Sequence, residues 1–180
     1  IYNILEKYDL SLATIEVSYM KGLLEKPEEF QNLASFYLYK QNPAMSARVL
    51  ETALSNKNIE FDKANAKLLS DAWLFAKERS RSLEVIEKSL NADPKDQKLV
   101  KQYINIAFSA FKWDEVIKGI NKAEQIGVED DGKHALMIGI AFFEKKNLKR
   151  AEDSFIEASQ SKKYADQGKA WLDYLNALRG

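Results

Sequence analysis

Apolar residues recur at intervals of three and four residues along most of the chain, and short polar breaks separate the runs. Segment 33–38 shows this spacing, and segment 47–54 repeats it after a break. Such spacing gathers apolar side chains on one face of an α-helix. The pattern predicts amphipathic helices at about 5–21, 28–40, 43–56, 62–77, 79–91, 95–110, 113–126, 132–145, 148–160 and 164–178.

The same chain also repeats itself over a longer distance. The repeat has four anchor positions, spaced 36, 34 and 35 residues apart, at Ala34, Ser70, Ile104 and Gly139. An aromatic residue follows three positions after most anchors, and small residues mostly follow after twelve and nineteen. A period in this range indicates stacked helical hairpins, because one hairpin cannot bury its own apolar face. The chain is expected to begin inside a repeat, since the frame also fits Ser11, Ile15 and Ser18.

Turn-forming residues stand at the breaks between the predicted helices. Asn42 with Pro43, and Asp93 with Pro94, have the order of an N-cap residue followed by proline in the first helical turn. Asn147 precedes another apolar run and has the same capping chemistry. These residues therefore predict where three of the helices begin.

This pattern of small and aromatic residues, with Pro94 near the end of a unit, resembles the tetratricopeptide repeat. The resemblance implies an all-α fold, a right-handed superhelix of helix-turn-helix repeats with a C-terminal capping helix. We expect one array over residues 1–180, as a fragment of a longer protein. Its expected parts are a partial repeat at 1–25, repeats at about 27–60, 63–96, 97–130 and 132–165, and the capping helix at about 164–178. The unit at 97–130 departs from the pattern, because Ile104 stands at the small anchor position.

Composition narrows the possible functions. The 27 basic residues balance the 27 acidic ones, so no overall positive field favours nucleic acid. With no cysteine and a single histidine, thiolate and poly-histidine metal sites are excluded. The seven glycines form no phosphate-binding loop, and no apolar run approaches the roughly 20 residues that span a bilayer. The sequence predicts neither an enzyme nor a cofactor site.

In tetratricopeptide arrays the first helix of each hairpin lines a concave groove that binds a protein or peptide. By this resemblance, the expected groove residues are Gln31, Ser35, Tyr39, Lys67, Asp71, Phe75, Lys98, Lys101, Asn105, Phe108, Ile140 and Phe143. They combine aromatic anchors with ammonium groups that suit carboxylates of a partner. The alternative is that some of these rings pack against neighbouring repeats.

Other candidate sites have simpler explanations. Lys101 and Asn105 resemble half of a clamp for a C-terminal carboxylate, but the following unit does not supply the other half. His134 is expected to be an exposed residue at a helix start, and Asp130 and Asp131 to favour the positive end of that helix. The basic run 145–150 is expected to be a solvated turn, with an acidic partner or lipid headgroups as the alternative.

A second resemblance covers more of the chain. Segments 22–27, 33–38, 47–54, 72–74 and 169–175 resemble tetratricopeptide proteins encoded beside TonB, ExbB and ExbD in marine gamma-proteobacteria. This resemblance implies a periplasmic adaptor of the TonB energy-transduction system, with TonB, ExbB or ExbD as partners. The alternatives are a cytoplasmic location, an envelope-assembly platform unrelated to TonB, or a structural array that associates with itself as a homo-oligomer.

Overall fold

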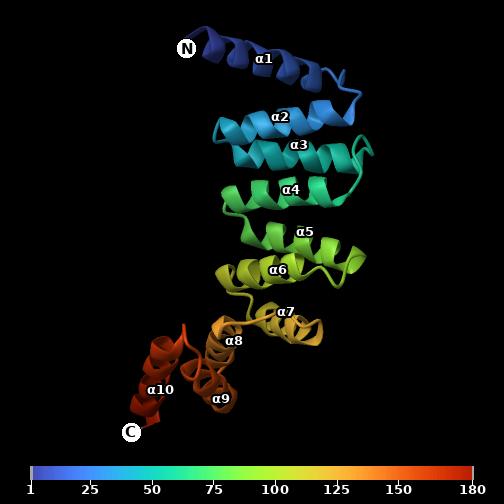
Figure 1. Cartoon of the computed structure of the whole chain (residues 1–180). Helices are drawn as coiled ribbons and strands as arrows, with labels where there is room; N and C mark the ends of the chain where they lie inside the picture. Colours follow the sequence, from blue (N-terminus) through green and yellow to red (C-terminus); the bar gives the residue numbers. More distant parts are fainter. Residues whose placement is uncertain (1, 180) are drawn as a thin grey trace. The chain divides into compact units, whose positions relative to one another are not determined.

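The computed structural model describes residues 2–179, with side chains from residue 10 onward, and its described part is built of α-helices (Figure 1). The helices are α1 (Tyr2–Met20), α2 (Pro27–Tyr39), α3 (Pro43–Ser55), α4 (Lys63–Phe75), α5 (Arg79–Ala92), α6 (Gln97–Ser109), α7 (Trp113–Gln125), α8 (Lys133–Glu144), α9 (Leu148–Ser159) and α10 (Ala165–Arg179). Each predicted helix is present, and the all-α fold class is confirmed.

Side chains of the predicted capping residues start two of these helices. The Asn42 side chain accepts a hydrogen bond from the backbone N–H of Met45, and Pro43 is the first residue of α3. Asn147 likewise caps α9. The prediction of Asp93 as a cap was wrong, because Asp96 caps α6 and accepts the N–H groups of two following residues at 2.8 and 3.1 Å. Pro94 therefore lies in the preceding turn.

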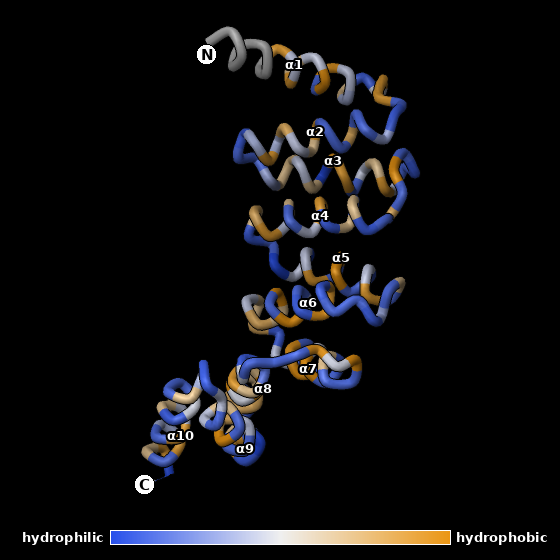
Figure 2. Tube along the Cα trace, in the orientation of Figure 1, coloured by the Kyte–Doolittle hydropathy of each residue, from blue (hydrophilic) through white to orange (hydrophobic). Residues whose placement is uncertain are grey.

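The chain divides into two compact units, Ile1–Ser89 and Leu90–Gly180. In the first unit α2 packs on α3 and α3 on α4, and in the second α6 packs on α7, α8 on α9, and α9 on α10. Figure 2 shows apolar segments recurring in the helices and polar segments at the turns between them. The arrangement of the repeats in one array stays a prediction.

Small residues lie where helices approach closely, as the repeat frame predicts. The positions nineteen residues after the four anchors, Ala53, Ser89, Ala123 and Ala158, are all buried. A side chain on Gly139 would lie 2.5 Å from the ring of Phe155, so glycine lets α8 and α9 approach there. The anchors thus mark close contacts within hairpins.

The unit that departs from the repeat pattern compensates for its large anchor. Ile104 is buried on α6, and Gly119 faces it from α7. A Cβ atom at Gly119 would lie 2.7 Å from Cγ1 of Ile104 and 3.0 Å from Cδ1 of Tyr103. The small residue that the anchor lacks is therefore supplied by the second helix of the hairpin.

Candidate functional site

The predicted groove residues lie on the first helices of the hairpins. In the first unit they belong to α2 and α4, and in the second unit to α6 and α8. Each helix turns its apolar stripe into the hairpin and leaves most of these residues on the remaining surface.

In the first unit, one hydrogen bond joins the two helices that carry groove residues. The side-chain amide of Gln31 on α2 donates to Oδ1 of Asn65 on α4 at 2.8 Å. Asn65 is itself buried and donates to the backbone oxygen of Glu60 at 2.9 Å. A buried amide that is bonded through both its oxygen and its nitrogen holds its neighbour in position. The surfaces of α2 and α4 are therefore adjacent.

Two aromatic rings stand out from this surface. Tyr39 and Phe75, at the last turns of α2 and α4, are 64% and 69% exposed. Between them in sequence, the ammonium of Lys67 forms an ion pair with Asp71 at 2.5 Å. This pair makes the centre of α4 locally neutral. The first unit thus offers two uncovered rings beside a polar surface whose ion pair has no net charge, which suits an apolar side chain of a partner.

A hollow of about 650 Å³ lies beside Tyr39. It is lined by residues of α1 and α2: Ser11, Ile15, Asn32, Ser35, Phe36 and Tyr39. Ser35 and Tyr39 were predicted groove residues, whereas the contribution of α1 was missed. The repeat frame was the signal for it, because Ser11 and Ile15 occupy positions that are buried in α3, α5, α7 and α9.

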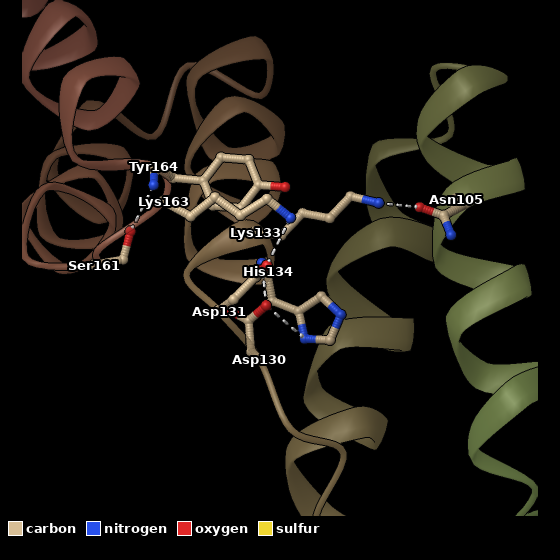
Figure 3. Close-up of polar contacts among 8 residues, drawn as sticks. All are labelled: Asn105, Asp130, Asp131, Lys133, His134, Ser161, Lys163 and Tyr164. Atoms are coloured by element: carbon tan, nitrogen blue, oxygen red, sulfur yellow. Dashed lines mark hydrogen bonds and ion pairs between the residues drawn. The ribbon is translucent and has the colours of Figure 1, made fainter.

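In the second unit, a side-chain hydrogen bond again joins the two first helices. Nζ of Lys133 on α8 donates to Oδ1 of Asn105 on α6 at 2.7 Å (Figure 3). Lys98 and Lys101 are exposed on α6. A polar hollow of about 350 Å³ is lined by Lys101, Asn105, Glu129, Asp130, Asp131, Lys133 and His134. Three carboxylates share this hollow with the amines, so it is not a purely cationic clamp.

Two acidic residues of this hollow have defined partners, because Asp130 caps α8 and Asp131 pairs with a lysine (Figure 3). Both carboxylate oxygens of Asp130 accept the backbone N–H of His134, at 3.0 and 2.9 Å. Asp131 binds Nζ of Lys163 at 2.9 Å, and this contact lowers the pKa of Asp131. The prediction of an exposed His134 was wrong, because its side chain is 12% exposed and its Nδ1 lies 3.8 Å from Asp130.

The remaining predicted rings are partly buried within the second unit. Phe108 packs edge-on against Trp113, with ring centroids 5.6 Å apart. Phe143 contacts Trp171 and Tyr174 of α10, at 5.2 and 5.8 Å, and Ile140 is half-buried. The rings of Phe143, Trp171 and Tyr174 help to line a further hollow of about 470 Å³. Phe108 and Phe143 therefore contribute to internal packing as well as to the surface.

Other kinds of site find little support among the described residues. No group of three or more histidine, cysteine, aspartate or glutamate side chains with metal-binding geometry occurs within residues 10–179. None of the helices described here combines the length and apolar character needed to cross a membrane.

Comparison with known proteins identifies the fold. No protein-family model matches the chain, and no curated protein matches it in sequence. Solved structures do match. MamA from Desulfovibrio magneticus RS-1 aligns with 12% identity and a TM-score of 0.61, over 84% of both chains. An RS-1 MamA double mutant gives 13% identity and a TM-score of 0.63, again over 84% of both chains.

A third solved structure that matches is described as a repeat protein. It is the C-terminal part of a TPR repeat-containing protein from Cytophaga hutchinsonii, with 17% identity and a TM-score of 0.60. The match covers 96% of this chain and 67% of that one. At such identities the likeness concerns the fold alone. The chain therefore has the tetratricopeptide-repeat fold that its sequence predicts.

Proposed function

We propose that this chain is a non-enzymatic scaffold that binds a protein or peptide segment along the first helices of its hairpins. Proteins of this architecture expose continuous surfaces for extended partners. The groove residues on α2, α4, α6 and α8 form the proposed binding surface.

One observation carries this proposal. In each unit a side-chain hydrogen bond joins neighbouring first helices, through Gln31 and Asn65 in one unit and Lys133 and Asn105 in the other. Aromatic groups stay largely uncovered on the surface of the first unit, although burying them would be favourable. Binding to helices whose positions are already set loses little conformational entropy, and exposed rings provide apolar area that a partner can cover.

The residues also indicate which chemistry the partner has. Tyr39 and Phe75 are suited to apolar side chains, whereas Lys98 and Lys101 on the second unit are suited to carboxylates. The first unit therefore suits a partner segment with apolar anchors, and the second unit suits one with acidic residues. Binding through Lys98 and Lys101 is expected to weaken as salt is added.

Substitution of the two exposed rings tests the proposal. The double variant Tyr39→Ala/Phe75→Ala is expected to weaken partner binding by about tenfold or more, because hot-spot rings dominate protein interfaces. Its melting temperature should stay near that of the wild type, since both rings are exposed. Ile156→Ala is the matched control, an exposed apolar residue on the second helix of a hairpin. Equal binding by wild type and double variant would disprove the proposed surface.

A finer proposal concerns the cellular system. We propose a periplasmic role with the TonB energy-transduction proteins, and the support for it is the sequence resemblance of segments such as 33–38 and 169–175. Envelope extract passed over immobilised protein should then leave TonB, ExbB or ExbD on the wild type and less on the double variant. Fractionation of cells tests the location, and recovery in the cytoplasmic fraction would contradict it.

A second candidate function is a self-associating platform. It is favoured by Leu10, Val17 and Met20 on α1, which are 69%, 45% and 76% exposed. At the positions of Val17 and Met20, the other second helices carry polar residues: Thr52, Lys88, Lys122 and Glu157, and then Ser55, Asn91, Gln125 and Gln160. Sedimentation of the wild type and of Val17→Lys over a wide concentration range tests it, and monomeric wild type throughout would refute it.

A further inference from the structure

The turn between α6 and α7 holds an aromatic residue in an unusual conformation. Phe111 has a φ of 57°, in the left-handed region that bulky side chains rarely adopt. Its side chain is 72% exposed, and its ring meets Trp113 edge-on at 5.7 Å. Most of the ring therefore faces solvent.

The other hairpins show that this turn does not require an aromatic residue. The equivalent positions, seven residues after each anchor, are Gln41, Lys77 and Lys146, with φ values of 57°, 63° and 62°. All three are polar, and all adopt the same left-handed conformation. Because polar residues satisfy the same turn, the geometry of the backbone does not explain Phe111. Its exposure means that core packing does not explain it either.

Cationic side chains lie on the turn that carries this ring and on the neighbouring α8–α9 turn. An ion pair between Nζ of Lys145 and Oδ1 of Asp114, at 2.6 Å, places the α8–α9 turn beside the start of α7. Exposed basic residues occur on these two turns, at Lys112 and Lys146, and in the first turn of α9, at Lys149 and Arg150. Nζ of Lys146 lies 5.8 Å from the ring centroid of Phe143, and the guanidinium of Arg150 lies 4.2 Å from that of Phe142. We call these four basic residues and Phe111 the basic edge.

Most carboxylates near the basic edge are already engaged. Asp114 is neutralised by Lys145, and Glu115 accepts a hydrogen bond from Tyr103 and pairs with Lys118 at 3.5 Å. Glu144, and Asp153 one helical turn after Lys149 and Arg150, are the further acidic residues next to these cations in the sequence. Four cations against these two carboxylates leave the basic edge positive, although the whole chain is neutral. A positive surface around an exposed ring calls for an anionic partner that also accepts apolar groups.

We propose that the basic edge binds the surface of an anionic lipid bilayer, with Phe111 entering the interface between headgroups and acyl chains. Basic residues gain from the negative potential of such a surface, and aromatic rings favour this interfacial zone. A ring that projects from a turn suits a deformable lipid surface, whereas a folded acidic protein would need a matching pocket. The basic edge shares no residue with the predicted groove, although Nζ of Lys146 lies 5.8 Å from the ring centroid of the groove residue Phe143.

Vesicle binding tests this proposal with the full chain. Co-sedimentation with phosphatidylglycerol-containing vesicles should retain the wild type, whereas pure phosphatidylcholine vesicles should not. Phe111→Asn should lower the bound-to-free ratio by about tenfold, because the ring no longer leaves water. Asparagine tolerates the left-handed conformation, so folding should persist, with circular dichroism as the check. The charge variant Lys146→Gln/Lys149→Gln should also bind more weakly than the wild type, and this difference should be larger at low salt than at high salt.

Ile156→Asn is the matched control, because it removes an exposed apolar side chain from the same unit outside the basic edge. It should bind vesicles as the wild type does. The proposal is overturned if wild type fails to bind anionic vesicles, or if Phe111→Asn and the charge variant both bind like wild type. Preference for soluble polyglutamate over anionic vesicles would also overturn it and indicate an acidic protein partner instead.

Discussion

Ser46 and Ser82 occupy equivalent positions in the repeat and are both buried, but their hydroxyl groups have different hydrogen bonding. Ser82 shares a hydrogen bond of 2.8 Å with Ser70, whereas the buried hydroxyl of Ser46 has no partner among the described residues. An unsatisfied buried hydroxyl costs stability, and removing one member of a pair leaves the other unsatisfied. The repeat frame predicts that both positions are small. It does not predict which hydroxyl is bonded, because that depends on the facing residue.

Alanine at Ser46 and at Ser82 should therefore change the free energy of unfolding in opposite directions. Ser46→Ala is expected to raise the free energy of unfolding by about 1 kcal/mol, because it removes an unpaired polar group. Ser82→Ala is expected to lower it by about 1 kcal/mol, because Ser70 loses its partner. Urea denaturation measures both. Destabilisation by Ser46→Ala would show that its hydroxyl is bonded in solution.

The ionisation of Tyr37 is expected to lower the stability of the fold at high pH. Burial raises its pKa to about 12, and a hydrogen bond with Glu16 acts in the same direction. The unfolded chain releases this proton near pH 10, so it binds fewer protons than the folded chain between pH 10 and 12. The stability contributed by neutral Tyr37 is present below pH 10 and is lost as the pH rises through 12.

Denaturation at a series of alkaline pH values, for wild type and Tyr37→Phe, checks this expectation. The variant should lose less stability over that range, because phenylalanine has no proton to release. Parallel slopes for the two proteins would show that Tyr37 ionises normally.

At the scale of the element, periodicity was sufficient to predict the helices, because each hairpin buries a regular stripe. Capping was less predictable. Asp93 and Asp96 both precede the same helix with capping chemistry, and the chain geometry selects Asp96. The partial burial of Phe108 and Phe143 was also not predictable residue by residue, since it depends on Trp113 and on α10.

The hairpin of α6 and α7 should depend on its glycine. Gly119→Ala is expected to lower the free energy of unfolding by about 1–3 kcal/mol, because the new methyl overlaps the side chain of Ile104. In an Ile104→Ala background the same change should cost much less, since the space has been opened. Asn121→Ala, at an exposed position of α7, is the control. Equal costs in both backgrounds would show that the two residues do not couple.

At the scale of the whole molecule, the fold could be predicted from repetition, whereas the choice of binding residues could only be narrowed. The frame places candidates on the first helices, and the structure distinguishes exposed Tyr39 and Phe75 from rings that also pack internally. The repeat frame also gave a signal for the contribution of α1, through Ser11 and Ile15. The contact of α10 with Phe143 depends on tertiary packing, and sequence periodicity carries no information about it.

The central claim is that partners bind along the first helices of the hairpins, and site-specific photocrosslinking tests it most directly. A photoreactive residue would replace Ser35 or Lys101 on that surface, and Thr52 or Glu157 on the second helices, all of them exposed. Partner adducts are expected from Ser35 and Lys101, and they should diminish in the Tyr39→Ala/Phe75→Ala background. Adducts that form at Thr52 and Glu157 but not at Ser35 and Lys101 would contradict the account.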